Sequence, residues 1–426
     1  MASFSLSFLI FLLHFSSFLN NIMAAKHNHH HDHHHHINHN HSSPSTSNSS
    51  DSNPRLHQAF IALQAWKRVI YSDPNNFTSN WLGPSVCNYT GIYCAPSIDN
   101  PDIRVVAGID LNHADIAGFL PDELGLLTDL ALIHLNSNRF CGIVPSTFSN
   151  LSLLYELDLS NNRFVGPFPT VVLSLPTLNY LDIRFNDFEG PLPPKLFSKK
   201  LDAVFVNNNR FTSLNIPQTL TASTSASVLV FANNNYGKGK KFMIPPSIVN
   251  FANSLEELVL TNTNLSGCLP QEIGFLYKLK VFDVSFNQIV GPIPYSMAGL
   301  FHLEQLNLGH NMMGGAVPAG ICELPNLANL TVSYNFFCEE DGVCLNLTSS
   351  RSKSKTKGVV FDDRRNCLPE RRFQRSEKEC SAALERPVDC EVDHGFGAGG
   401  GGGAAFAPVP AAVPLPSAPS LSPAHS

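Results

Sequence analysis

The dominant feature of the chain is a pattern of apolar and polar positions that returns about every 24 residues. Its clearest copy, residues 153–169, reads LLYELDLSNNRFVGPFP. Leucines alternate with polar residues over the length of a short strand, an Asn follows, and Gly and Pro close the copy. The template L-x-x-L-x-L-x-x-N-x-F-x-G-x-x-P fits ten copies. Their Asn slots hold Ala114, Asn138, Asn162, Asn186, Asn209, Asn234, Thr263, Asn287, Asn311 and Asn335.

This period and pattern predict an α/β fold, a leucine-rich-repeat solenoid over residues 105–337. The two apolar positions of L-x-L point inward on a short strand, because side chains alternate there. The Asn side chain is expected to bond backbone groups of adjacent coils, and the Phe two residues later fills the next corner. Gly and Pro in every copy exclude long helices.

One step of the repeat is longer, at 29 residues, and covers the stretch NYGKGKKFMIPPSIVNFAN at 235–253. It lacks the G-x-x-P return and carries three lysines. Two interpretations stay open: a bulge on the convex side, or a basic contact loop.

The residues before the first repeat, 54–104, predict an N-terminal cap that covers the apolar end of the solenoid. Asn53 is placed to cap a helix and Pro54 suits its first position. Cys87 and Cys94 are expected to form a disulfide that closes a short loop beneath this helix. The apolar stripe of the helix consists of Leu56, Phe60, Leu63, Trp66 and Ile70.

Both termini have the composition of unfolded or processed segments. Residues 1–25 resemble a cleaved secretory signal peptide; the alternative, a membrane anchor of about 17 residues, is short for a bilayer. No second long apolar run is present, so no membrane span is expected. Residues 26–53 are His-rich and predicted to be disordered, serving as a polar spacer or as a loose metal binder without fixed geometry. Residues 392–426 form a Gly- and Pro-rich disordered tail.

Two further features of the composition favour an extracellular protein. All ten cysteines follow the signal segment, which fits an oxidising compartment. The chain also carries candidate N-glycosylation sites, which fit secretion: Asn48, Asn76, Asn88, Asn150, Asn264, Asn329 and Asn346.

The net charge of −6 argues against a nucleic-acid partner.

The segment 338–391 breaks the repeat and is read as a Cys-rich hinge. It is too polar to fold without bridges. Its cysteine pairing, and that of three cysteines inside the repeats, is left open by the sequence; an intermolecular bridge giving a disulfide-linked homodimer is one alternative. The cysteines concerned are Cys141, Cys268, Cys322, Cys338, Cys344, Cys367, Cys380 and Cys390.

Several of these stretches together resemble the plant leucine-rich-repeat extensins. They are the cap, AFIALQAWKRVIYSDPNNFTSNWLGPSVCNYTGIYC, the repeat VSFNQIVGPIP, and FDDRRNCLPERRFQRSEKEC followed by RPVDC. The resemblance covers 54–391 and implies a secreted, cell-wall-associated protein. It also implies that the repeats bind small basic Cys-rich peptides of the rapid-alkalinisation-factor type and modulate wall assembly and cell growth.

The chain departs from the family pattern in two places. The family's long Ser-Pro runs are largely missing, so cross-linking of the tail into the wall is not expected. Family members commonly have a Cys in the repeat that ends at Asn234, and its absence here predicts that Cys268 has lost its neighbour.

A partner is expected on the concave face, at the outward positions between the inward leucines. Acidic and aromatic groups there suit a basic peptide; solvated aspartates without a binding role are the alternative. The candidates are Asp110, His134, Glu156, Asp158, Tyr180, Asp182, Glu257 and Asp283. A glycan on Asn329 would limit this site toward the C-terminus.

No catalytic motif is recognised, so no enzyme activity and no cofactor are expected. An extracellular inhibitor of pectin-degrading enzymes is the alternative function. The wall polysaccharide pectin is a second candidate partner.

Overall fold

The computed structural model describes residues 53–214, 216–218, 225–236, 242–347, 358–369, 371–385, 388 and 390. The predicted signal peptide, the His-rich segment with Asn48, the lysines of the long repeat step and the C-terminal tail lie outside the described residues.

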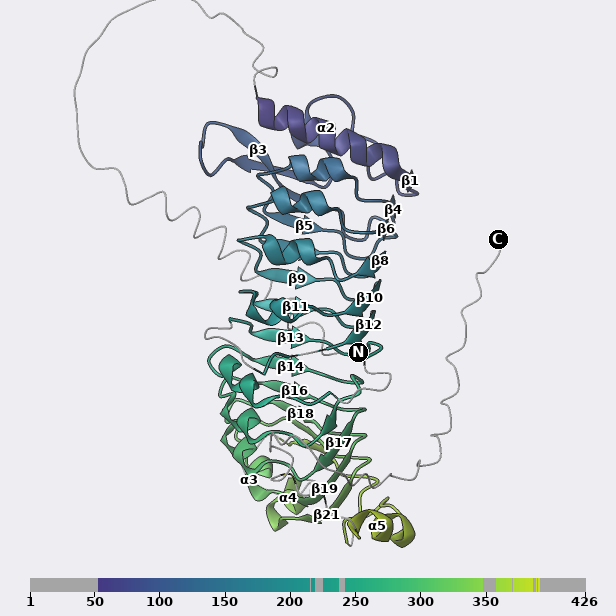
Figure 1. Cartoon of the computed structure of the whole chain (residues 1–426), viewed down its shortest axis with the longest axis vertical. Coiled ribbons are helices and arrows are strands. Elements are labelled where there is room, and N and C mark those ends of the chain that lie inside the picture. The colour runs from purple at the N-terminus through teal and green to yellow at the C-terminus, as the bar shows by residue number, and fades with distance from the viewer. Residues whose placement is uncertain are drawn as a thin grey trace, which may run out of the picture. The chain divides into compact units, whose positions relative to one another are not determined.

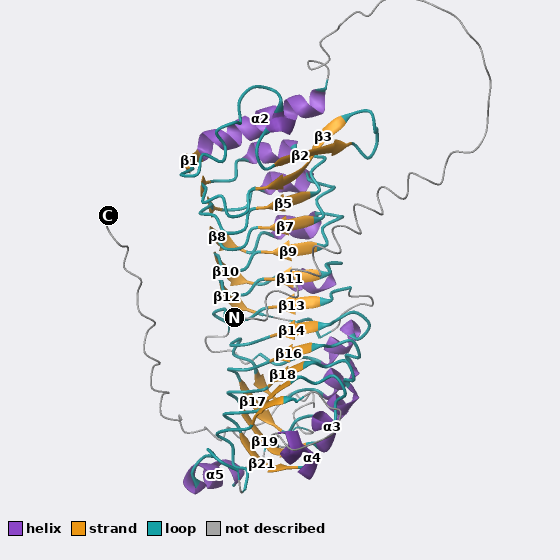
Figure 2. Cartoon of the chain, turned by 180° about the vertical axis from the view of Figure 1, so that it is seen from behind, coloured by secondary structure: helices purple, strands orange, loops and turns teal. Residues whose placement is uncertain are grey.

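The described part is a stack of coils built around one long sheet of twelve strands (Figures 1 and 2). Its first pair is antiparallel and the remaining pairs are parallel and in register. This confirms the predicted solenoid. In sheet order the strands are β2 (Ile92–Pro96), β3 (Arg104–Asp110), β5 (Leu132–His134), β7 (Glu156–Asp158), β9 (Tyr180–Asp182), β11 (Ala203–Phe205), β13 (Val228–Val230), β14 (Glu257–Val259), β16 (Val281–Asp283), β18 (Gln305–Asn307), β20 (Asn329–Thr331) and β22 (Val360–Asp362).

Shorter strands follow the ladder asparagines and form two further parallel sheets, and β1 pairs with β4. The first sheet contains β6 (Cys141–Gly142), β8 (Arg163–Pro167), β10 (Asp187–Pro191) and β12 (Arg210–Ser213). The second contains β15 (Ser266–Gly267), β17 (Gln288–Gly291), β19 (Met312–Val317) and β21 (Phe336–Glu340); β1 is Ile70–Ser72 and β4 is Ala117–Gly118.

In most coils the Pro of the template directly precedes a short helical turn on the return path, as Pro145 does before η3. Fixed φ makes Pro well suited to this position. The 3₁₀ turns are η1 (Val86–Asn88), η2 (Asp122–Leu126), η3 (Ser146–Asn150), η4 (Thr170–Ser174), η5 (Pro194–Ser198), η6 (Pro246–Phe251), η7 (Gln271–Phe275) and η8 (Tyr295–Gly299). The α-helices are α2 (Pro54–Val69), α3 (Ala319–Cys322), α4 (Gly342–Leu347) and α5 (Glu377–Leu384).

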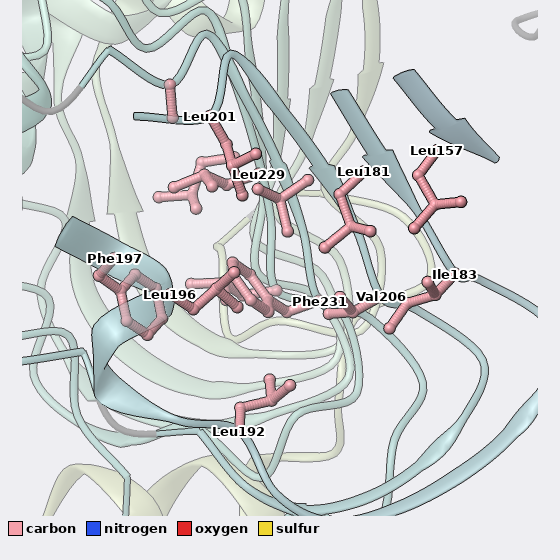
Figure 3. Close-up of a cluster of buried hydrophobic side chains, with 14 of the residues drawn as sticks. Leu157, Leu181, Ile183, Leu192, Leu196, Phe197, Leu201, Val206, Leu229 and Phe231 are labelled. Atoms are coloured by element: carbon pink, nitrogen blue, oxygen red, sulfur yellow. The ribbon is translucent and has the colours of Figure 1, made fainter. Parts of the chain in front are cut away.

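The core fills the space between the long sheet and these turns. Leu157 and Leu181 reach it from neighbouring strands, and Phe197 reaches it from η5 (Figure 3). The template Phe packs along the stack as predicted: Phe164 and Phe188 are fully buried, with ring centroids 6.2 Å apart. A continuous core across all coils explains why no single coil would fold alone.

The asparagine of each regular coil ties the backbones of two neighbouring coils together. Asn162 donates through Nδ2 to the carbonyl oxygens of Leu135, Leu159 and Ser160, and its Oδ1 accepts from the amide of Phe140. The predicted role of the Asn slot is therefore confirmed. The same pattern recurs at Asn138, Asn186, Asn209, Asn234, Asn287, Asn311 and Asn335.

The ladder continues one coil beyond the ten predicted from the sequence. Asn366 donates to Val332 O and Asp363 O and accepts from Phe337 N, and the strand before it, β22, extends the long sheet. The segment read as a hinge thus begins with an eleventh coil.

The N-terminal cap has the predicted form. Asn53 accepts hydrogen bonds from the amides of Arg55 and Leu56, Trp66 is fully buried, and Cys87 is bonded to Cys94. Of the predicted stripe, Leu63 is also buried, whereas Leu56, Phe60 and Ile70 are partly buried against the core.

Three disulfides order the C-terminal end. Cys322 bonds to Cys344, Cys367 bonds to Cys380, and Cys268 bonds to Cys390. The expectation that Cys268 has lost its partner is wrong, because the chain returns after the last coil and brings Cys390 beside β15.

Space for the bond between Cys268 and Cys390 is made by Gly291. Its φ is +76°, and a Cβ there would overlap the sulfur of Cys390.

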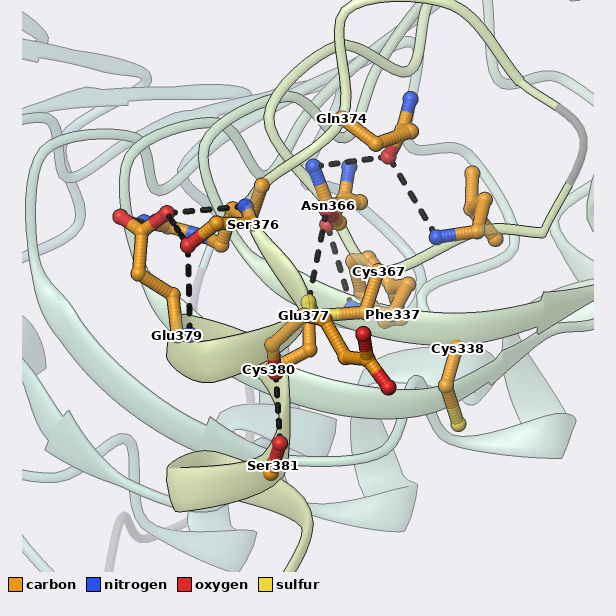
Figure 4. Close-up of a disulfide and its surroundings, with 12 residues drawn as sticks. Phe337, Cys338, Asn366, Cys367, Gln374, Ser376, Glu377, Glu379, Cys380 and Ser381 are labelled. Atoms are coloured by element: carbon orange, nitrogen blue, oxygen red, sulfur yellow. Dashed lines mark hydrogen bonds and ion pairs between the residues drawn. A yellow bond between two sulfur atoms is a disulfide. The ribbon is translucent and has the colours of Figure 1, made fainter.

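Beside the bond between Cys367 and Cys380, Ser376 and Glu379 form a capping box at the start of α5 (Figure 4). Among the described residues the free cysteines are Cys141 and Cys338.

Candidate functional site

The predicted site residues lie on the face of the long sheet that is turned away from the core, here called the open face. In the sheet register Asp110 is paired with His134, His134 with Asp158, and Asp158 with Asp182. Parallel in-register strands place paired residues side by side. Four of the predicted residues therefore form one row across β3, β5, β7 and β9, which follow one another in Figure 2.

Glu156 and Tyr180 are paired in the adjacent row. Six of the eight predicted residues thus come together, and we call them the acidic cluster: Asp110, His134, Glu156, Asp158, Tyr180 and Asp182. Glu257 and Asp283 lie apart from this cluster on β14 and β16, beyond the more apolar strands β11 and β13.

Within the acidic cluster, His134 and Glu156 form an ion pair, with His134 Nε2 3.0 Å from Glu156 Oε2. Burial lowers the pKa of His134. The hydrogen bond and charge of Glu156, with the charges of Asp158 and Asp110, outweigh burial and leave this pKa raised. The imidazole therefore offsets part of the negative charge when it is protonated.

Asp182 is the exception to the predicted exposure, because its side chain is 0% exposed. It lies 3.0 Å from Arg184 Nε, accepts from the Arg184 amide, and has Tyr180 Oη 3.5 Å away. Burial and the nearby charge of Asp158 raise its pKa well above the usual value. The prediction of an accessible carboxylate is wrong here, because the Asp182 side chain is buried.

The other aspartates of the open face share a local bond to their own backbone. Asp110 accepts from the amide of Asn112, Asp158 from that of Ser160, and Asp283 from that of Ser285. Such bonds to the residue two positions ahead fix the end of each strand.

The second carboxyl oxygen distinguishes two of these aspartates. In Asp283 it accepts from Asn307 Nδ2, 3.0 Å away, whereas in Asp158 it makes no hydrogen bond with a described residue. Asp158 therefore keeps one acceptor for a cationic partner.

A cation that the sequence analysis did not select lies next to the acidic cluster. The Arg184 guanidinium stands over the ring of Phe205, 5.1 Å from the centroid. Its charge also acts on Glu257, whose pKa burial raises and Arg184 lowers. The sequence does carry a signal for it, because the other copies of the template hold an uncharged Asn, Ser, Thr, Ala or Gly at the position where this coil has Arg.

The sequon asparagines differ in exposure. Asn76, Asn88, Asn150 and Asn329 are exposed, the last on β20 of the open face. Asn264 is partly buried and accepts from Gln288 Nε2 at 2.6 Å. Asn346 lies in α4, with its side chain outside the described set. Glycosylation of these residues stays a prediction.

Candidate metal sites and membrane-spanning helices are both absent from the residues that the structure describes. These residues contain no group of three or more His, Cys, Asp or Glu that could hold a metal ion. They also contain no helix long and apolar enough to cross a membrane. The His-rich segment lies outside the described residues.

Family models for leucine-rich repeats match residues 128–188 and 254–276. Among solved structures, the chain is similar to the ectodomain of the Arabidopsis receptor kinase HAESA in complex with an IDA peptide hormone ligand. The TM-score is 0.62 at 26% identity, covering 74% of this chain and 50% of that one. A plant ice-binding protein shares the fold at a TM-score of 0.54 and 22% identity, over 67% of this chain and 88% of that one.

The most informative relatives come from Arabidopsis thaliana. Leucine-rich repeat extensin-like protein 6 is 64% identical over 339 residues, which are 80% of this chain and 69% of the relative. Leucine-rich repeat extensin-like protein 4 is 57% identical, over 79% of this chain and 65% of the relative. The pollen-specific protein 3 of the same series is 51% identical, and the chain spans 48% of its length. The coils, the cap and the identity to these relatives show that the chain belongs to the leucine-rich repeat extensin-like family.

Proposed function

We propose that this protein acts in the plant cell wall after secretion, binds small basic Cys-rich peptides of the rapid-alkalinisation-factor type, and thereby modulates wall assembly and growth. The observation that carries the proposal is the acidic cluster. Asp110 lies on β3, and Glu156 and Asp158 lie on β7, on either side of β5 on one open face and beside the aromatic ring of Tyr180.

The electrostatics of the cluster support a cationic ligand. Opposite charge on the two partners speeds their encounter and selects against wrong partners. Arg and Lys side chains of a peptide would find the unbonded oxygen of Asp158 and the ion-paired Glu156, while Tyr180 offers an apolar contact.

The similarity to the HAESA ectodomain adds a second line of support. Those structures are described as the receptor kinase in complex with a peptide hormone, and one of them also contains the co-receptor SERK1. A peptide ligand for this chain is a proposal by analogy of architecture.

The family consists of non-enzymatic repeat proteins, and the chain is accordingly not an enzyme. Binding is therefore the property to test.

The test is isothermal calorimetry with a synthetic, oxidised peptide of the rapid-alkalinisation-factor type. We expect the variant Glu156→Gln with Asp158→Asn to bind at least about tenfold more weakly, equivalent to about 1.4 kcal/mol. The matched control, Asp122→Asn with Glu123→Gln, removes the same charges from the exposed turn η2 and should bind as the wild type does. Equal affinity of both variants would refute the acidic cluster as the binding site.

A further inference from the structure

A column of residues with left-handed backbone runs along the stack, one residue before each ladder position. Its φ angles lie between 52° and 58°. The residues are His113, Ser137, Asn161, Phe185, Asn208, Asn233, Asn262, Phe286, His310, Tyr334 and Arg365, and we call them the left-handed column.

Three successive positions of this column carry rings that the backbone does not favour. Left-handed φ costs an ordinary L-residue about 1–2 kcal/mol, and Asn tolerates it best. Four earlier coils use Asn, but the later coils have Phe286, His310 and Tyr334. Phe286 is 53% exposed and Tyr334 is 40% exposed. Neither backbone preference nor core packing explains these residues, and such strain concentrates at functional sites.

The three rings stack on one another with their edges left for solvent. The centroid of His310 is 4.1 Å from that of Phe286 and 4.1 Å from that of Tyr334, with interplanar angles of 12° and 11°. Stacking uses the negative faces of the rings and leaves the positive edges. A protonated or neutral His310 and the Tyr334 hydroxyl add hydrogen-bond donors at those edges.

Arginine residues lie at and beside the last position of the left-handed column. Arg365 follows Tyr334, is exposed, and forms no ion pair with a described residue. Arg375 lies over the Phe336 ring, 4.2 Å from its centroid, and forms an ion pair with Glu379 at 3.6 Å. Burial lowers the pKa of His310, the charge of Asp362 raises it, and the smaller effect of Arg375 lowers it. The Asp362 carboxylate is engaged by two bonds from Arg364, of 2.8 and 2.9 Å. Arg365 is therefore the cation at this end of the column that is available to an anion.

The backbone beside the rings is already bonded. The amide of Phe286 donates to Gly309 O, that of His310 to Ser333 O, and that of Tyr334 to Arg364 O. An extended peptide has no free amides here to pair with, so strand addition is excluded along this column. A linear polymer with regularly repeated carboxylates and hydroxyls fits the regular row of donors better.

We propose that Phe286, His310, Tyr334 and Arg365 bind a polymer of sugar acids, with its carboxylates at Arg365 and the ring edges. This site is separate from the acidic cluster and does not depend on the proposed peptide binding. It gives the polysaccharide partner expected from the sequence a specific location.

The proposal is tested by titrating the full-length protein with an oligogalacturonate at two salt concentrations. The probes for comparison are the methyl-esterified oligomer of the same length and polyglutamate. We expect binding of the free acid that weakens with salt, and at least about tenfold weaker binding of the ester and of polyglutamate.

The test variant is His310→Asn with Tyr334→Asn, because Asn is the residue that the fold itself uses at this position and folding should be preserved. We expect at least about a tenfold loss of affinity. Phe185→Asn, which removes an exposed ring at the same position of a distant coil, is the matched control and should bind normally. Equal binding of the ester overturns the carboxylate contact, equal or stronger binding of polyglutamate overturns the sugar polymer, and unchanged affinity of the double variant overturns the site.

Discussion

His134 Nε2 lies 3.0 Å from Glu156 Oε2, and the two residues come from the neighbouring strands β5 and β7. The strand register places Asp110 and Asp158 on either side of His134. A single basic side chain of the protein is thus surrounded by carboxylates on the face where a basic ligand is proposed.

This ion pair predicts a pH-dependent contribution to stability. The pKa of His134 is raised above its ordinary value of 6.5, so the folded state binds the proton more tightly than the unfolded chain does. The added stability is fully present below the unfolded pKa and is lost as pH rises through the folded pKa. His134→Gln should therefore lower the free energy of unfolding more at about pH 5 than at about pH 8, measured by urea denaturation. A loss that is the same at both values would contradict the ion pair.

The asparagine ladder predicts that a single substitution strongly lowers the stability of the fold. Asn162→Ala leaves the amide of Phe140 and the carbonyl of Leu135 without their side-chain partner inside the stack. At about 1–3 kcal/mol for each buried group left unpaired, we expect the free energy of unfolding to fall by at least about 2 kcal/mol in chemical denaturation.

The neighbouring Asn161→Gly is the control for the ladder. Asn161 has a φ of 52°, which glycine adopts readily, so stability should change by less than about 1 kcal/mol. Comparable losses in the two variants would show that the ladder bonds are not what stabilises the coils.

The bond between Cys268 and Cys390 predicts a thermal effect on the whole stack. It closes a loop of 122 residues, and loops of about this size are worth about 4–5 kcal/mol in the chain-entropy model. Cys268→Ser with Cys390→Ser should lower the melting temperature measured by calorimetry. Cys141→Ser, at a free cysteine, should leave that temperature nearly unchanged. An unchanged melting temperature in the double variant would be inconsistent with this pairing.

The free cysteines predict a simple labelling pattern. Alkylation of the native, unreduced protein should modify Cys141 and Cys338 and leave the eight cysteines of the four disulfides unmodified. Peptide mapping by mass spectrometry gives the answer. Protection of Cys338 together with a doubled mass would instead support the disulfide-linked homodimer considered from the sequence.

Much of the fold was predictable because the main interactions of each repeat form between residues that are close in sequence or in adjacent coils. The Asn slot, the Phe two residues later and the Asn53 cap each act within one coil or across one neighbour, and the structure has all of them in place. The pair of Cys87 and Cys94 was also predictable, because the two residues are only seven apart.

The features that were missed depend on parts of the chain that are distant in sequence. The eleventh coil was hidden because its strand reads VFD and its Asn366 comes 31 residues after Asn335, outside the regular period. The partner of Cys268 lies 122 residues away.

The candidate site shows the same division. The strand period placed Asp182 correctly on the open face, but its burial depends on where Tyr180 and Arg184 turn, which the pattern does not encode. The aromatic part of the left-handed column was missed because the template treats that slot as free.

The most direct test of the central claim, that a basic peptide binds the acidic cluster, is a charge-reversal cycle. Asp158→Arg would be titrated against the parent peptide and against peptides in which each Lys or Arg is replaced by Glu. We expect Asp158→Arg to weaken the parent peptide and one of the Glu-substituted peptides to recover affinity, with a coupling energy above about 1 kcal/mol. Coupling near zero for every peptide would contradict contact between the cluster and the ligand.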